Sequence, residues 1–280
     1  MDLKKHSDRA GHCIIRDRHG SSTYLLRDLA AVLERSRKYS FDKMIYVVGG
    51  TDNTLHFSRL FKLLELMDMS DLASKLDHVQ FSEVSQMSKK LGHGHMLSEI
   101  LDQSQIAMQQ SLEAHPEKAA LLGGTPEAVA AIGITALLSQ ELSARKGNDH
   151  AFDIDKMTSF EAGTGPDIEW RYAKLCSILK NNPRHTNLSE EDYASFEEEE
   201  QSNLLRLLVQ YPDITQTAYK NLESATIMTY LISVADQLST CLEEDPDGEN
   251  VTPAQAMLYE ATRIVLENGM KLLGIVPLTK

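Results

Sequence analysis

His56 is a candidate for acid–base chemistry because of its place in the chain. It follows the stretch GGTDNTL, residues 49–55, which succeeds a β-branched run and precedes a helical pattern. Ligands of parallel sheets bind beyond the carboxyl ends of the strands, so a histidine at this turn could transfer a proton. A structural or substrate-shaping role is an equal alternative. Asp52, in the same turn, is a second candidate for assisting proton transfer.

Nucleophilic and metal chemistry are less clearly indicated. Four side chains could act as nucleophiles near this turn, but no neighbouring base singles one out; they are Cys13, Ser22, Thr51 and Ser58. His93 and His95 stand two apart, and nothing nearby supplies the further ligands of a zinc site, so we interpret them as loop residues. The cysteines, Cys13, Cys176 and Cys241, are too far apart to suggest a disulfide framework or zinc knuckle. The sequence predicts no metal and no cofactor.

A second candidate site combines aromatic and basic residues. Trp170, Arg171, Tyr172 and Lys174 stand close together in one helical pattern. Aromatic rings stack on nucleobases and cations pair with phosphates, so this cluster could contact a nucleic acid. The alternative, equally weighted, is that Trp170 and Tyr172 are core residues. We predict that Trp170, Arg171 and Lys174 bind a nucleic acid.

The elements that position His56 alternate between strand and helix. The β-branched runs 12–17, 43–50 and 76–82 predict strands, and the intervening stretches 25–39 and 54–68 show helical spacing of apolar residues. This order predicts a parallel sheet with right-handed crossovers. Three strands leave an apolar edge or face uncovered unless the N-terminal segment or a partner chain covers it. This favours a homo-oligomer formed through the exposed sheet edge.

The remainder of the chain predicts helices. Their stretches are 124–145, 188–210, 224–242 and 252–274, with Thr125–Pro126 and Ser189 at the starts of the first two and Asn268–Gly269 or Gly274 ending the last. We therefore predict two domains, an α/β domain over 1–97 and a helical bundle over 98–280. The Gly-, His- and Ser-rich stretch 85–98 is the predicted linker.

Charge limits the partners of the chain. The formal net charge of its 280 residues is −13, which argues against a non-specific nucleic-acid binder. Basic residues crowd the first segment and acidic residues the stretch 189–200, so an anionic partner should meet the N-terminal part. No run is long and apolar enough for a membrane span or signal peptide. We expect a cytoplasmic protein.

Longer stretches resemble the arginyl-tRNA synthetase family. TYLLRDLAAVLERSRKYSFDKMIYVVGGTDNTLHFSRLFKLL, residues 23–64, resembles the second half of its catalytic domain, with the family's L-Y-x-T-R-D-x-x-A and F-D-x-x-I-Y-V-V segments. FDIDKMTSFEAGTGPDIEWRYAKLCSIL, residues 152–179, resembles the start of its helical anticodon-binding domain, marked by S-F-E-G-x-T-G-P-Y. The resemblance implies a truncated, Rossmann-like parallel half-domain followed by a helical bundle of the anticodon-binding type.

The departures from the family are informative. The loop MSKKL, residues 87–91, has Leu91 where the family's M-S-x-x-K motif has its lysine. The family's opening half, with its H-x-G-H motif, has no counterpart, since GHGH at 92–95 follows that loop. These groups stabilise transferring phosphates, so we expect no aminoacyl-adenylate chemistry. Asp167 and Leu242 replace tyrosines of the family's tRNA-reading surface, which implies altered tRNA contacts. By this resemblance, the nucleic acid that Trp170, Arg171 and Lys174 are predicted to bind is tRNA.

The arginine pocket, by resemblance, is partly retained. The family's tyrosine and aspartate that grip arginine map onto Tyr24 and Asp28, four residues apart and so on one helix face. A carboxylate accepts a guanidinium in bidentate fashion, and a tyrosine can hydrogen-bond or stack against it. Thr51 and Asn53 at the strand end complete the predicted pocket. The alternative is that Asp28 pairs with Arg27 or Arg35 while Tyr24 is a core residue.

An arginine pocket and a tRNA-facing domain without ATP chemistry resemble the fungal arginine-containing cyclodipeptide synthases. The predicted function is therefore to join the arginyl group of arginyl-tRNA to the aminoacyl group of a second aminoacyl-tRNA, which forms a cyclic dipeptide. Two alternatives stay open. One is a non-catalytic tRNA or arginine sensor, and the other is a subunit that docks on a true synthetase.

Overall fold

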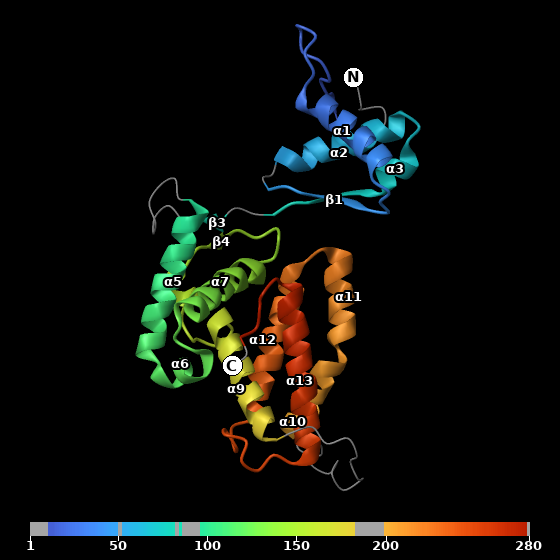
Figure 1. Ribbon diagram of the computed structural model, residues 1–280. Helices are drawn as coiled ribbons and strands as arrows, with labels where there is room; N and C mark the ends of the chain where they lie inside the picture. Colours follow the sequence, from blue (N-terminus) through green and yellow to red (C-terminus); the bar gives the residue numbers. More distant parts are fainter. Residues whose placement is uncertain (1–10, 50–51, 82–83, 86–95, 183–198, 279–280) are drawn as a thin grey trace. The chain divides into compact units, whose positions relative to one another are not determined.

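The computed structural model describes residues 11–49, 52–81, 84–85, 96–182 and 199–278 (Figure 1). Contacts divide the chain into two compact units, which are treated separately below. Unit 1 contains residues 1–83 and 146–150, and unit 2 contains residues 84–145 and 151–280. The predicted domain boundary stood at residue 97, whereas the contacts place the main division after Glu83. The signature-like loop and the two histidines at 93 and 95 lie outside the described residues.

Unit 1 contains a short parallel sheet. β1 (Met44–Val47) pairs with β2 (Leu76–Val79) in parallel, with Met44 opposite Leu76 and Val47 opposite Val79. These two strands and their direction confirm the predictions for 43–50 and 76–82. The fold class, a partial Rossmann-like sheet followed by a helical domain, is likewise confirmed.

The strand predicted at residues 12–17 is wrong. The segment forms no continuous strand among the described residues, and Arg16 makes an isolated antiparallel bridge with Ser22. Asp17 Oδ1 accepts the backbone N–H groups of His19 and Ser21 at 2.8 and 2.9 Å, and Gly20 completes the reversal with a φ of +84°. An aspartate that binds the backbone two residues ahead favours a turn. The β-branched residues of this segment therefore lead into a tight turn and not into the sheet.

Helices α1 (Tyr24–Lys38) and α2 (Asp52–Leu66) lie on one side of β1, and the short α3 (Ser70–Ser74) precedes β2 (Figure 1). Their apolar faces meet in one buried cluster, which includes Leu29, Val32, Phe57 and Leu60. The alternate residues of β1 that point the other way are uncovered within unit 1, because Ile45 is 38% and Val47 64% exposed. A parallel sheet is ordinarily covered on both faces, so this face is an unusual apolar surface.

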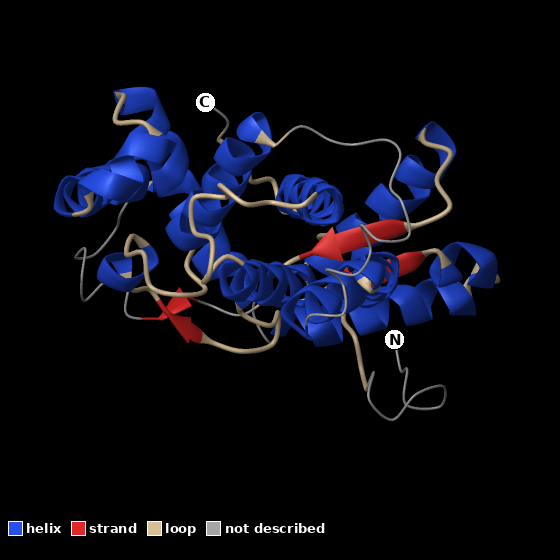
Figure 2. Cartoon of the chain, turned by 90° about the horizontal axis from the view of Figure 1, so that it is seen from below, coloured by secondary structure: helices blue, strands red, loops and turns tan. Residues whose placement is uncertain are grey.

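Unit 2 is mainly helical, as Figure 2 shows by colour. Its helices are α5 (Leu97–Ala114), α6 (Pro116–Leu122), α7 (Pro126–Ser143), α8 (Ile154–Met157), α9 (Gly165–Asn181), α10 (Glu199–Val209), α11 (Tyr211–Asn221), α12 (Ser224–Cys241) and α13 (Pro253–Leu272). Two-residue strands, β3 (Val84–Ser85) and β4 (His150–Ala151), form a second small sheet, which the sequence did not predict. The main core lies between α9, α10, α12 and α13.

Threonine caps fix the starts of the long helices. Thr125, Thr164 and Thr252 each accept a backbone N–H with their side-chain oxygen, and a proline follows in the first turn of each helix. The predicted start at Thr125–Pro126 is confirmed. The last long helix passes through Asn268 and Gly269 and ends at Leu272, with Gly274 at a φ of +77° two residues beyond. Of the two predicted ends, the structure thus supports Gly274.

No single described helix combines the length and the apolar character of a membrane span, although α6 and α7 do so as a pair bent by 101°.

Candidate substrate site and nucleic-acid interface

Asp28 and His56 are brought together by the packing of two helices in unit 1. Asp28 lies in the second turn of α1 beside the buried Leu25 and Leu29, and His56 in the second turn of α2 beside the buried Phe57. The Nε2 atom of His56 lies 2.7 Å from Oδ2 of Asp28. The side chains are 25% and 44% exposed respectively. The pair is therefore fixed by core neighbours yet open to a ligand.

An aromatic stack holds the histidine side of this pair. The Phe57 ring stacks on His78 with centroids 4.4 Å apart and lies 4.7 Å from the Tyr46 ring. Nε2 of His78 is 3.2 Å from the carbonyl oxygen of Val48, at the end of β1. Burial raises the pKa of Tyr46, so its phenol stays protonated. The residue that follows His56 is thus anchored to both strands.

The turn between β1 and α2 is tied by side chains. The Asn53 amide donates to the carbonyl oxygen of Gly49, and the Thr54 hydroxyl donates to Oε1 of Gln80 at 2.7 Å. Asn53 thus shapes the turn, and its predicted contact with substrate stays a prediction. Asp52 begins α2, but its side chain, like the whole of Thr51, lies outside the described residues.

Tyr24 is a surface residue at the start of α1. It is 77% exposed, and the Arg27 guanidinium carbon lies 5.4 Å from its ring centroid. Arg27 also donates to the carbonyl oxygen and hydroxyl of Ser22. The alternative that Tyr24 is a core residue is therefore wrong. Asp28 pairs with His56, whereas Arg27 bonds to Ser22 and Arg35 to Tyr46. The sequence indicated both Asp28 and His56, but it held no signal that they pair.

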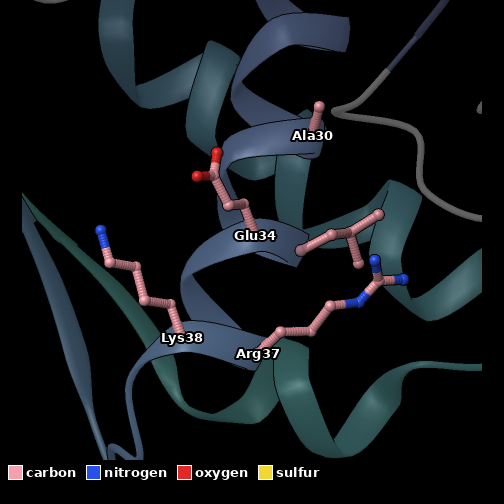
Figure 3. Close-up of a pocket in the computed structure, with 5 residues that line it drawn as sticks. Ala30, Glu34, Arg37 and Lys38 are labelled. Atoms are coloured by element: carbon pink, nitrogen blue, oxygen red, sulfur yellow. The ribbon is translucent and has the colours of Figure 1, made fainter.

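A separate hollow of about 470 Å³ lies along the C-terminal half of α1. Its lining residues are Ala30, Leu33, Glu34, Arg37 and Lys38, all from this one helix. Glu34 and Lys38 extend to one side of the helix and Arg37 to the other (Figure 3). Because one helix supplies every lining side chain, this hollow is a surface depression and not an enclosed pocket.

In unit 2, two lysines lie close to the Trp170 ring. The Lys118 ammonium from α6 is 4.6 Å from the Trp170 ring centroid, and the Lys174 ammonium from α9 is 5.5 Å away. Lys118 also lies 4.5 Å above the Phe160 ring. Burial lowers the pKa of Lys118, against the opposing effect of Asp167. The sequence pointed to Trp170 and Lys174, but Lys118 was missed because it is distant in the chain.

Arg171 holds two helices of unit 2 together. Its Nε donates to Asp167 at 3.0 Å, and one terminal nitrogen donates to the Ala235 carbonyl and to Asp236 at 2.8 and 2.7 Å. The Arg171 side chain is only 12% exposed. It therefore ties α9 to α12, and its predicted contact with tRNA stays a prediction. Tyr172 is a core residue at 1% exposure, as one of the alternatives held.

A hollow of about 250 Å³ opens beside Trp170. It is lined by Trp170, Arg171, Lys174, Leu238, Ser239, Leu242, Glu243 and Pro246. Its apolar wall, its indole and its lysine offer stacking and charge to one planar, anionic group. Leu242 is itself buried.

Glu169 is a buried acid that the sequence did not single out. It is fully buried, and it accepts hydrogen bonds from the Thr135 hydroxyl at 3.2 Å and from the Leu278 backbone N–H at 3.1 Å. Burial raises the pKa of Glu169 to about 7. In the sequence, its position between the apolar Ile168 and Trp170 could have indicated that Glu169 is buried. Among the described residues, no group of three or more His, Cys, Asp or Glu side chains could hold a metal ion.

Comparisons with known proteins agree with this division. Residues 1–154 match the family model described as tRNA synthetases class I (R), catalytic domain. Residues 168–280 match the DALR anticodon binding domain.

Curated relatives match the whole chain. The probable cytoplasmic arginine–tRNA ligase of Schizosaccharomyces pombe is 34% identical over 288 residues, covering 100% of this chain and 46% of that protein. The cytoplasmic arginine–tRNA ligase of Saccharomyces cerevisiae is 33% identical, covering 100% of this chain and 47% of that protein. The chain thus spans about half the length of the curated relatives it matches.

Solved structures show the same fold. The arginyl-tRNA synthetase of Thermus thermophilus gives a TM-score of 0.81 at 17% identity, over 99% of this chain and 53% of that one. That of Plasmodium falciparum gives 0.77 at 21% identity, over 94% and 46%. With a catalytic-domain model matching more than half of its residues, and an anticodon-binding domain following it, the chain belongs to the arginyl-tRNA synthetase family.

Proposed function

We propose that this protein takes the arginyl group of arginyl-tRNA and joins it to the aminoacyl group of a second aminoacyl-tRNA, releasing an arginine-containing cyclic dipeptide. The observation that carries this proposal is the Asp28–His56 pair, 2.7 Å between Oδ2 and Nε2. It combines a carboxylate with a proton-transferring group in the part of the chain that matches a synthetase catalytic domain. The same chain carries an anticodon-binding domain.

The arginyl side chain is held by Tyr24 and Asp28. Oδ2 of Asp28 engages His56, which leaves Oδ1 for a guanidinium nitrogen. Tyr24 is exposed four residues earlier, one turn away on the same helix. Asn53 lies beyond the strand end where the ester would bind, and Thr51 precedes it by two residues in the sequence. A guanidinium that binds a carboxylate and an aromatic face together is well suited to this arrangement.

The tRNA is held by unit 2. Trp170 provides a stacking face, and Lys118 and Lys174 provide two positive charges beside it. Arg171 supports this surface by joining α9 to α12. A net negative protein with a local cationic and aromatic surface binds nucleic acid selectively and not by bulk charge.

The chemistry of the proposal needs no ATP. Leu91 stands where the family motif has a lysine, which disfavours phosphate chemistry at that loop. The ester of arginyl-tRNA already carries activation energy, so catalysis needs positioning and proton transfer.

The deciding experiment incubates purified protein with arginyl-tRNA and a mixture of other aminoacyl-tRNAs, followed by mass spectrometry. We expect an arginine-containing cyclic dipeptide whose mass identifies the second residue. A parallel reaction receives ATP, free arginine and uncharged tRNA, and we expect no charging there. ATP-dependent charging, or intact arginyl-tRNA after prolonged incubation with bound protein, would contradict the proposal.

The uncovered sheet face favours a second candidate, a non-catalytic subunit that docks on a synthetase. Ile45 and Val47 expose apolar surface on a strand of a parallel sheet, and a partner could cover them. This candidate predicts a stable complex with arginyl-tRNA synthetase in size-exclusion chromatography and no cyclic product. The homo-oligomer predicted through the exposed sheet edge would instead show itself as a dimer of this chain alone.

Replacing Lys174 tests the tRNA surface. We expect Lys174→Gln to weaken tRNA binding severalfold and to reduce the slope of log affinity against log salt by about one, because one phosphate contact is lost. Lys220→Gln on α11 removes the same charge from an exposed position and serves as the matched control. Equal losses in the two variants would show that only net charge matters. Filter binding across a salt series gives both quantities.

A further inference from the structure

The hydrogen bond between His56 and Asp28 determines which ring nitrogen of His56 carries the proton. A carboxylate offers only acceptors, so a hydrogen bond between Asp28 and Nε2 requires the proton on Nε2. Oδ2 lies 2.7 Å from that nitrogen, a short distance typical of a charge-assisted bond. In the neutral ring, Nδ1 then carries the lone pair. Within residues 11–49 and 52–81, no hydrogen bond to Nδ1 is present.

We propose that Asp28 positions His56, holding its imidazole in the tautomer protonated at Nε2 so that Nδ1 receives the proton of the attacking amine. This inference rests on the proposed function and assigns Asp28 a role beyond gripping arginine. Asp28 acts through His56 and is a positioning residue, while His56 is the catalytic residue. When one ring nitrogen of a histidine donates a fixed hydrogen bond, the other nitrogen keeps its lone pair and can accept a proton.

The supporting structure is rigid on both sides of the pair. Asp28 precedes the buried Leu29, and His56 precedes the buried Phe57. Phe57 is stacked on His78 and lies against Tyr46. Both members of the pair therefore sit on helices whose neighbouring residues are locked in one core, a better support for catalytic geometry than a loop provides.

The proton transfer balances over two steps. The α-amine of the second aminoacyl group attacks the arginyl carbonyl carbon, a C–N bond forms, and the C–O bond to the ribose breaks. Nδ1 of His56 takes the proton that the amine loses and returns it to the departing ribose oxygen. The arginyl α-amine then attacks the second ester in the same way, closing the ring and releasing the second tRNA. No oxidant or further reactant is needed.

A double-mutant cycle in the full chain tests the assignment. We expect His56→Gln to lower kcat about a hundredfold, the ordinary scale of general-base catalysis. Asp28→Asn should lower kcat by a comparable factor, because an amide no longer enforces the tautomer. The double variant should fall no further than His56→Gln alone. His19→Gln, on the exposed turn before α1, is the matched control and should change kcat by less than about twofold.

Nitrogen NMR of protein labelled in its histidines supplies a readout independent of turnover. We expect His56 to be protonated at Nε2 in the wild type and to shift toward the Nδ1 tautomer in Asp28→Asn. A wild-type Nδ1–H tautomer would overturn the positioning role. So would multiplying losses in the double variant, or an Asp28→Asn variant with raised KM and unchanged kcat. The expected tautomer in a protein that forms no product would instead overturn the proposed function and leave the pairing intact.

Discussion

Arg171→Met should lower the free energy of unfolding by about 4 kcal/mol, within the range found when one member of a buried ion pair is removed. The reason is that Asp167 is 3% exposed and Arg171 is the cation bonded to it. Burial already raises the pKa of Asp167, and the Arg171 guanidinium is the largest opposing influence. Without it the buried carboxylate keeps only the weaker support of the Gly163 N–H and of the Lys118 charge. Urea denaturation at neutral pH measures the loss.

The double variant Asp167→Asn with Arg171→Met is the informative comparison. It removes the buried charge together with its partner, so it should recover a large part of the loss. Arg206→Met on the exposed side of α10 is the control. The guanidinium of Arg206 donates to Asn203 on its own helix, so the substitution should cost about 0.5 kcal/mol or less. If Arg171→Met cost no more than Arg206→Met, the tie between α9 and α12 would have no energetic weight.

Glu169→Gln should stabilise the protein in alkaline solution and leave it unchanged in acid. The pKa of Glu169 is raised to about 7 from an ordinary value of 4.5. Below pH 4.5 the carboxyl is protonated in both states. Between pH 4.5 and 7 the unfolded chain loses the proton while the folded protein keeps it, so stability falls as pH rises. The total is about 3 kcal/mol above pH 7.

Glutamine removes this pH dependence because it cannot ionise. Its carbonyl can accept from the Leu278 N–H and its amide can donate to the Thr135 hydroxyl, so the shape of the site is kept. We expect the variant to exceed the wild type by about 3 kcal/mol at pH 8 and to equal it at about pH 3.5, by denaturation at both values. Glu113→Gln on the exposed side of α5 is the control. A parallel pH profile for the wild type and Glu169→Gln would contradict the assignment.

Local signals in the sequence predicted the elements well. Thr125 caps a helix through a residue three positions away, and the parallel strands follow from β-branched runs divided by a helical stretch. The failure at residues 12–17 was local too, since the aspartate of the turn outweighed the β-branched pair. Sequence motifs and hydrophobic periodicity therefore predict the features that depend on residues close together in the chain, such as helix starts and strands.

The pairings at the sites could not be predicted, because they join distant residues. Asp28 and His56 are 28 positions apart, and Arg171 and Asp236 are 65 apart. Nothing in a helical period says which residue of another helix will face a given side chain. Trp170 and Lys174 were found because one helix carries both, whereas Lys118 arrives from α6.

The hydrogen bond that the Leu278 N–H donates to Glu169 forms late during synthesis of the chain. The two residues are 109 positions apart, a stretch that a ribosome elongates in about 5 to 20 seconds. During that interval α9 has been made, but the Leu278 N–H that will donate a hydrogen bond to Glu169 has not. The Thr135 hydroxyl, which is made earlier, is already available to the acid, whereas the Leu278 N–H can bond to it only after residue 278 has cleared the exit tunnel. The hydrogen bonds of this buried carboxyl are therefore completed late in the synthesis of the helical unit.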